Sequence, residues 1–218
     1  MKFLNYPSSG SYQGLTFSRN RNGQYVRSRA IPVNPHTSFQ AAVRARLASN
    51  AQDWRELTAL QREGWATLGE QIVRNDTLGQ SYTLTGFQAF VLVNNNKMAA
   101  GDTVVLDAPV HDVPEPLTTV TATITVASFN VAFTPTPLAA TERIFVSGGP
   151  QRSPGRTFEG DYRLLQVSAA AGLSPQVAFS SYIARMGTPV VGNKIFVSVQ
   201  RYASGFLSTA INTSAIVT

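Results

Sequence analysis

The fold of the second half of the chain is decided by one stretch of sequence, Thr119-Val120-Thr121-Ala122-Thr123-Ile124-Thr125-Val126. Threonine alternates with aliphatic residues throughout it, and successive side chains of a β-strand point to opposite faces of the sheet. The stretch therefore predicts a strand that is buried on its aliphatic face, with water or a neighbouring element against its threonine face.

Six further runs with the composition of β-strands follow this stretch, and Pro and Gly turns separate them. They span residues 129–133, 143–147, 162–167, 177–185, 194–201 and 206–211. About seven short strands over the 117 residues from Asp102 to Thr218 are the content expected of an immunoglobulin-like or fibronectin-type β-sandwich. We therefore expect a β-sandwich domain over residues 118–218, preceded by a linker or first strand over residues 102–117.

Between residues 35 and 101 the apolar residues recur mostly every three or four positions, which is the spacing of an α-helix. Asn34-Pro35 has the form of an N-cap followed by a proline at the first helical position, and it predicts a helix over residues 36–56. The apolar stripe of this helix consists of Phe39, Val43, Leu47, Ala51 and Trp54. We expect the stripe to face the core of a small helical domain.

Two capping boxes of the form Thr-x-x-Gln predict where the next two helices begin. Their residues are Thr58 with Gln61, and Thr85 with Gln88. The apolar stripe after the first box consists of Leu60, Trp65, Leu68 and Ile72. Gly101 is expected to end the helix after the second box. The sequence therefore predicts a three-helix domain over residues 35–101, with Trp54 and Trp65 in one core because the connection between their helices is very short.

Residues 1–34 are rich in Ser, Gly, Asn, Tyr and Arg and are predicted to form an extended basic arm. Asn22-Gly23 stands between two short extended runs, residues 15–19 and 25–31, and predicts a β-hairpin. An isolated hairpin is marginal in water, and this one has little apolar surface to bury. The whole chain is therefore expected to be an α+β protein whose arm needs support from outside itself.

The net charge of +6 comes from the N-terminal end of the chain. Residues 1–50 hold seven basic residues and no Asp or Glu, whereas positive and negative charges nearly balance over the rest of the sequence. A surface without carboxylates over so long a stretch predicts an acidic partner. The candidate partner-binding residues are Arg19, Arg21, Tyr25, Arg27, Arg29, Arg44 and Arg46.

Two kinds of partner could pair with these arginines, an acidic protein surface and a nucleic acid. Arginine alternates with Ser and Asn at strand-like spacing in this part of the sequence. The aromatic residues that could stack on bases, Tyr12, Phe17 and Tyr25, are few and irregularly placed. We therefore favour a protein partner, with nucleic acid as the alternative.

Motifs for catalysis, cofactors and metals are absent from the sequence. It contains no cysteine and two histidines, His36 and His111, and it has no nucleophile-elbow, dinucleotide-binding or zinc-protease motif. We expect His111 to lie in an extended, solvated linker, and Glu159 and Asp161 to form loop ion pairs. No catalytic, cofactor-binding or metal-binding residue is predicted. No membrane span is predicted, because no apolar run approaches about 18 residues. No secretory leader is predicted either, because Asn5-Tyr6-Pro7 interrupts the first apolar residues too early for the apolar region of a leader.

A resemblance to known proteins covers about residues 10–100. Residues 17–29, FSRNRNGQYVRSR, are followed by Pro32-Val33-Asn34-Pro35 and by a predicted helix that contains Gln40 and Arg44. Further motifs lie at residues 54–58, 61–65 and 84–91. In this order they are similar to motifs of poorly characterised proteins encoded by tailed bacteriophages and prophages. The predicted sandwich resembles the general immunoglobulin-like type that phages use on virion surfaces, so the resemblance implies a virion structural component.

From these observations we expect a non-enzymatic virion structural protein that uses no cofactor. The most specific expectation is a capsid-associated accessory protein, of the decoration or cement type, that grips coat subunits through its basic arm. Its partners would be coat or other virion proteins and further copies of itself, with no membrane involved, and it would be assembled in the host cytoplasm. The alternatives are a tail or head-to-tail connector component and a nucleic-acid-binding protein.

Overall fold

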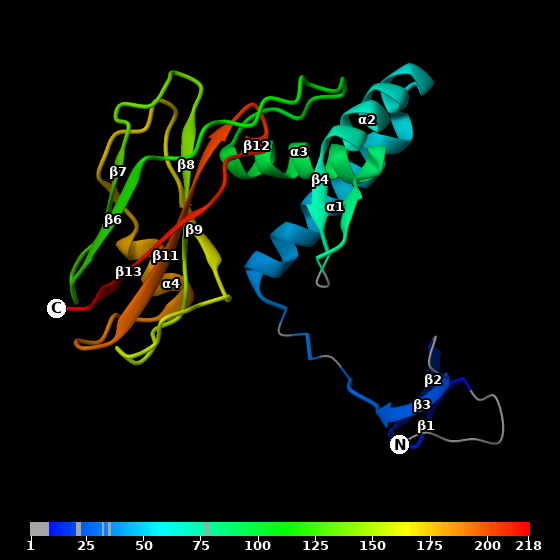
Figure 1. The fold of residues 1–218 in the computed structure, drawn as a ribbon, viewed down its shortest axis with the longest axis horizontal. Coiled ribbons are helices and arrows are strands. Elements are labelled where there is room, and N and C mark those ends of the chain that lie inside the picture. The colour runs from blue at the N-terminus through cyan, green and yellow to red at the C-terminus, as the bar shows by residue number, and fades with distance from the viewer. Residues whose placement is uncertain (1–8, 21–22, 32, 35, 77–78) are drawn as a thin grey trace. The chain divides into compact units, whose positions relative to one another are not determined.

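A computed structural model shows a mixed α+β fold with four helices and several antiparallel sheets in the described residues (Figure 1). The structure describes residues 9–20, 23–31, 33–34, 36–76 and 79–218. The chain forms two compact units, Met1–Ala42 and Val43–Thr218, which we call the N-terminal unit and the C-terminal unit. The α+β class predicted from the sequence is therefore confirmed.

The N-terminal unit contains a three-stranded antiparallel sheet in the order β1-β2-β3. Its strands are β1 (Gly10–Tyr12), β2 (Leu15–Asn20) and β3 (Gly23–Ser28). The predicted hairpin is confirmed, because β2 and β3 pair from Leu15 with Ser28 to Asn20 with Gly23. The three residues of β1 are too few to show a periodicity, so the sequence does not predict this strand. Residues 21–22 of the predicted turn lie outside the described residues.

Helix α1 (Ser38–Glu56) begins two residues later than the sequence predicts. The hydroxyl of Thr37 accepts a hydrogen bond from the backbone N–H of Gln40 at 3.3 Å, which is the geometry of an N-cap. The side chain of Asn34 instead accepts a hydrogen bond from the backbone N–H of His36, whose φ is +49°. The prediction of an N-cap at Asn34 is therefore wrong, because this side chain forms a local turn before the helix.

Helices α2 (Ala59–Gln71) and α3 (Gly86–Ala100) begin at the two predicted capping boxes, and both reciprocal hydrogen bonds are present in each box. Gly101 ends α3 as predicted, with a φ of +78°. Close packing at the end of α2 depends on another glycine, since a Cβ on Gly69 would lie 2.5 Å from the carbonyl oxygen of Leu84. A short hairpin between the two helices consists of β4 (Val73–Asn75) and β5 (Ser81–Thr83).

The helical part of the C-terminal unit has one aromatic core. Trp65 is fully buried, and its ring centroid lies 5.1 Å from that of Phe90. Trp54 is half-buried and its ring lies 5.5 Å from the same phenylalanine, so the predicted shared core is confirmed. Leu60 is 78% exposed, and its predicted place in the buried stripe of α2 is wrong. Successive residues of an α-helix are rotated by about 100° around its axis, so Leu60 points roughly 80–140° away from the buried residues of the stripe.

The predicted linker, residues 102–117, contains no described helix or strand, but it packs onto the helices. The side-chain amide of Asn94 in α3 donates to the carbonyl of Val105 at 3.0 Å and accepts from its N–H at 2.9 Å. The indole N–H of Trp65 donates to the carbonyl of Leu106 at 2.7 Å. These bonds satisfy the polar groups of the buried Asn94 and Trp65 side chains, so they hold the segment in one path over α2 and α3.

The rest of the C-terminal unit is built on two antiparallel sheets. One has the order β10-β7-β6, and the other has the order β12-β11-β8-β9 with β13 also paired to β11. The strands are β6 (Thr119–Ile124), β7 (Phe129–Thr134), β8 (Arg143–Gly148), β9 (Arg163–Val167), β10 (Gln176–Val177), β11 (Lys194–Ala203), β12 (Phe206–Leu207) and β13 (Ile211–Ile216). The backbone N–H of Thr218 donates to the carbonyl of Ile124 at 3.2 Å, which links the C-terminus to the end of β6.

The two sheets share an apolar core. Ile124 and Val131 come from the first sheet and Val146 and Val197 from the second, and all four are almost fully buried. In β6 the threonines are exposed and the aliphatic residues are partly or fully buried, with Ile124 the deepest. The strand predicted from the alternation is therefore confirmed for residues 119–124. Val126, which the alternation predicts on the buried face, lies beyond the end of β6 and is 48% exposed.

Most of residues 177–185 form a helix, so the strand predicted there is wrong. After the two residues of β10, helix α4 spans Phe179–Met186. Tyr182 of this helix is fully buried in the core that the sheets share. The apolar residues of α4 recur every three or four positions, which is the helical spacing, although β-branched and aromatic composition favoured a strand. They are Phe179, Tyr182, Ile183 and Met186.

Candidate functional site

The N-terminal sheet has an apolar face and a polar face, because opposite residues of antiparallel strands lie on the same face. The apolar face carries Tyr12, Leu15, Phe17 and Val26. The polar face carries Ser11, Thr16, Ser18, Tyr25 and Arg27. Tyr12 is 67% exposed and Leu15 is 43% exposed, so much of the apolar face meets solvent.

The candidate residues of this sheet lie on both of its faces. Arg19 is on the apolar face, whereas Tyr25 and Arg27 are on the polar face. Arg29 follows β3, and its backbone N–H donates to the carbonyl of Gly14 at 2.6 Å. A partner that covered either face would therefore meet at least one guanidinium group. Arg21, also a candidate, lies outside the described residues.

The arginines of the N-terminal region differ in their partners from those of the two sheets of the C-terminal unit. Arg143, Arg152 and Arg201 each pair with a carboxylate of the same unit, as the ion pairs with Asp102, Glu159 and Glu142 show. In contrast, the N-terminal unit contains no Asp or Glu, so Arg19, Arg27 and Arg29 have no carboxylate side chain to pair with in their own unit. Within the C-terminal unit, no described carboxylate lies within ion-pair distance of Arg46.

Helix α1 carries an apolar stripe that is covered over its second half alone. There, Asn50 is fully buried and the ring of Trp54 lies 5.6 Å from that of Phe87. The first half consists of Phe39, Val43 and Leu47, which are 45%, 57% and 51% exposed. The expectation that the whole stripe faces a helical core is wrong for these three residues, because the aromatic contacts of α1 with α3 lie towards its C-terminal end.

The two candidate arginines of α1 flank this exposed stripe. Successive residues of an α-helix are rotated by about 100° around the helix axis. Viewed down this axis, the stripe from Phe39 to Leu47 covers an arc of roughly 80°. Arg46 lies about 20° beyond one edge of the arc, and Arg44 lies about 60° beyond the other. Arg44 is exposed and Arg46 is half-buried. The first half of α1 therefore presents an apolar strip between basic groups.

A network of hydrogen bonds and one ion pair joins the start of the 102–117 segment to the larger sheet. The carboxylate of Asp102 accepts from the guanidinium of Arg143 at 2.8 Å and from the hydroxyl of Tyr202 at 2.6 Å. Burial raises the pKa of Asp102, but the bonds from Tyr202 and Arg143 outweigh it and hold this pKa below its usual value. Burial and the bond to Asp102 raise the pKa of Tyr202. Because both carboxylate oxygens are engaged within the fold, the network has a structural role.

Glu159 and Asp161 form the loop ion pairs that the sequence predicts. Glu159 is almost fully buried, pairs with Arg152, and accepts backbone hydrogen bonds from Gly160 and Asp161. The bond from Arg152 and the backbone bonds lower the pKa of Glu159 to about 2 against the opposing effect of burial. Asp161 pairs with Arg163 at 3.5 Å, and both of these side chains are exposed. This cluster stabilises a loop.

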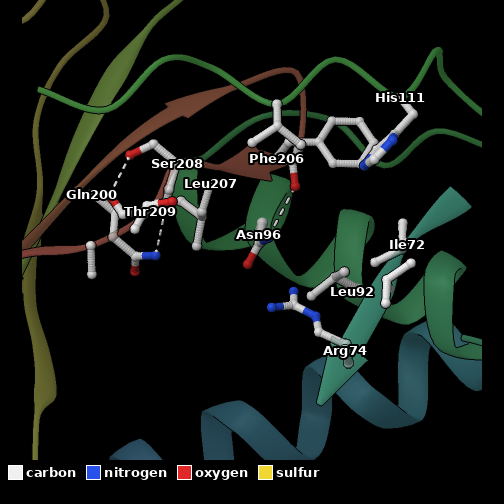
Figure 2. Close-up of a pocket in the computed structure, with 14 residues that line it drawn as sticks. Ile72, Arg74, Leu92, Asn96, His111, Gln200, Phe206, Leu207, Ser208 and Thr209 are labelled. Atoms are coloured by element: carbon white, nitrogen blue, oxygen red, sulfur yellow. Dashed lines mark hydrogen bonds between the residues drawn. The ribbon is translucent and has the colours of Figure 1, made fainter. Parts of the chain in front are cut away.

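A cavity of about 500 Å³ lies in the C-terminal unit where residues of β4 and α3 meet those around β12 (Figure 2). The amide of Asn96 in α3 donates to the carbonyl of Gly205 at 2.9 Å. The amide of Gln200 in β11 donates to the carbonyl of Ser208 at 2.9 Å. Arg74 of β4 reaches into the same space from the opposite side, as Figure 2 shows. The sequence gives no signal for this cavity, because its lining comes from segments far apart in the chain.

His111 also lines the cavity, and it does not lie in a solvated linker as the sequence predicts. It is half-buried, and its ring lies 5.2 Å from the ring of Phe206 at an angle of 68°. The prolines near it keep the backbone extended, but apolar contacts hold that extended segment against the fold. The imidazole is therefore held in a defined position at the rim.

Comparisons with known proteins assign none of these residues a role. No protein-family model matches this sequence, and no curated protein does either.

The described residues do not gather into a metal site or a membrane span. Over the described ranges, no three His, Asp or Glu side chains are grouped so that they could hold a metal ion. Each helix that the structure describes is too short or too polar to cross a bilayer. The basic N-terminal region and the cavity are two surfaces of the described chain that have binding capacity not used within the fold.

Proposed function

We propose that this chain is a non-enzymatic structural protein of a tailed-phage virion, which binds acidic surfaces of coat subunits through its N-terminal unit and the first half of α1. The observation that carries the proposal is the contrast between arginines. Those of the C-terminal sheets are paired within the fold, whereas Arg19, Arg27 and Arg29 lie in a unit that contains no Asp or Glu. The virion setting rests on the resemblance of residues 10–100.

The exposed apolar groups support a protein partner. Tyr12 and Leu15 on the sheet, and Val43 and Leu47 on α1, remain in contact with water in the isolated chain. Covering such surface contributes about 25 cal/mol per Å² of apolar area, and arginine beside it adds charge-assisted hydrogen bonds to carboxylates. A coat subunit with apolar surface bordered by Asp and Glu would use both kinds of group. A phosphate backbone would use the arginines and leave the apolar groups in water.

The C-terminal unit would have a second role in the virion. Its two sheets around a shared core would serve as an immunoglobulin-like module that projects from the particle or bridges to the next copy of the chain. Repetition on an icosahedral or ring-shaped particle would make many weak contacts act together. A tail or connector position is the alternative within the same class, and copy number separates the two, because a decoration protein is present in hundreds and a connector in about a dozen.

The test is co-sedimentation of purified variants with empty, genome-free shells. Arg19→Gln with Arg27→Gln removes one positive charge from each face of the N-terminal sheet. Arg55→Gln with Arg163→Gln removes the same total charge from exposed positions elsewhere and serves as the matched control. We expect the first variant to lose shell binding by about tenfold or more and the control to retain it, since each charged contact contributes about 1–3 kcal/mol. Equal loss in both variants would contradict a specific role for the sheet.

A further inference from the structure

We propose that the cavity of the C-terminal unit is a binding site for a small organic acid, whose carboxylate pairs with Arg74 and whose apolar body lies against Leu92 and Leu207. The site is independent of the N-terminal region, so this inference does not rest on the proposed function. Figure 2 shows Arg74 entering the space from one side and Gln200 and Leu207 from the other.

The size and composition of the cavity suit a small molecule. Its volume of about 500 Å³ is within the range of roughly 300–1,000 Å³ that is usual for ligand sites. Ile72, Leu92, Phe206 and Leu207 give it apolar walls. A few polar groups converge among them, which is the pattern of a site that holds a ligand in one orientation.

Charge selects the class of ligand. Arg74 is the one side chain with a full charge at neutral pH among the described residues that line the cavity, and no Asp or Glu lines it. No described carboxylate pairs with its guanidinium group. A planar guanidinium matches a carboxylate with two parallel hydrogen bonds, so a monoanion of this shape completes the site. A multiply charged phosphate would meet one guanidinium and several apolar walls, which is a poorer match.

The polar groups opposite Arg74 are already fixed in place. The amides of Asn96 and Gln200 each use one N–H in a bond to a backbone carbonyl, and each keeps a second N–H and an oxygen for a ligand. Contact with Phe206 holds the ring of His111. Because these groups are positioned by the fold, a ligand would bind with little further ordering.

The experiment is isothermal titration of the full chain with 4-phenylbutyrate, indole-3-acetate and acetate. Inorganic phosphate and 4-phenylbutyramide are titrated beside them, because the amide has the shape of 4-phenylbutyrate without its charge. We expect at least one acid with an apolar body to bind, and acetate, phosphate and the amide to bind much more weakly. If none of the acids binds, or the amide binds as well as its acid, the inference is wrong.

Arg74→Gln tests the anchor, and Arg55→Gln is the matched control because both arginines are exposed and neither is in an ion pair among the described residues. We expect Arg74→Gln to weaken binding of the acid by about tenfold or more, as loss of a charged hydrogen bond does, and to leave the thermal midpoint of the free protein unchanged. The acid should raise the midpoint of the Arg55→Gln protein but not that of Arg74→Gln. Equal affinities in the two variants would overturn the assignment, whatever the outcome of the shell-binding experiment.

Discussion

Replacing Trp65 by phenylalanine should destabilise the protein far more than the same replacement at Trp54. Trp65 is fully buried, and its indole N–H donates to the carbonyl of Leu106 at 2.7 Å. Phenylalanine cannot donate, so this carbonyl would lose its partner at a cost of about 1–3 kcal/mol. The smaller ring would also leave a void that costs about 1–2 kcal/mol. The expected total for Trp65→Phe is therefore about 2–5 kcal/mol.

Trp54 provides the matched comparison, because it belongs to the same core but is half-buried, and no hydrogen bond of its indole is described. Trp54→Phe keeps an aromatic ring beside Phe87 and Phe90 and should cost about 1 kcal/mol or less. Urea titrations followed by circular dichroism give both free energies of unfolding without relying on tryptophan fluorescence. Equal costs, or a larger cost at Trp54, would refute the described role of the Trp65 hydrogen bond.

Three further predictions follow from the fold. Gly69→Ala should lower the thermal midpoint, because its Cβ would lie 2.5 Å from the carbonyl of Leu84, whereas Gly155→Ala has nothing within 4 Å and should have little effect. The pKa of Glu159 is lowered from 4.5 to about 2, so its contribution to stability should be complete above about pH 4.5 and lost as the pH falls towards 2. Glu159→Gln should therefore flatten this part of the pH–stability curve, and an unchanged curve would count against the ion pair. Deleting residues 1–34 keeps the Thr37 cap of α1 and should leave cooperative unfolding with the wild-type midpoint but abolish incorporation into particles. Loss of cooperativity would show that the deleted residues support the core.

Local sequence signals predicted the elements that depend on a few neighbouring residues. Both capping boxes and the C-terminal glycine of α3 satisfy backbone groups within four residues, so their function is visible in the sequence itself. The alternation of threonine and aliphatic residues in β6 likewise indicates which face of the strand is buried. At α4 the same method failed, because strand-like composition and helical spacing disagreed over residues 177–185 and the spacing decided the structure.

The surfaces with unused binding capacity depend on contacts between distant segments, and the sequence predicted them less well. The apolar stripe of α1 is regular in the sequence from Phe39 to Trp54, but its residues up to Leu47 are exposed in the structure. The spacing of apolar residues cannot show which of them another element covers. The cavity brings together Arg74, His111 and Gln200, which come from three separate parts of the sequence. By contrast, the acid-free charge of the first 50 residues was evident at once, because it is a property of composition.

Whether the basic N-terminal region binds an acidic protein surface is tested by the affinity of the purified full chain for empty shells and for duplex DNA across one salt series. We expect binding to the shells that weakens moderately with salt, because buried apolar contacts persist when charges are screened. We expect weaker binding to DNA, falling by orders of magnitude between low and moderate salt. Tight, steeply salt-sensitive binding to DNA with no affinity for the empty shells would rule out the protein partner and favour a genome-binding role.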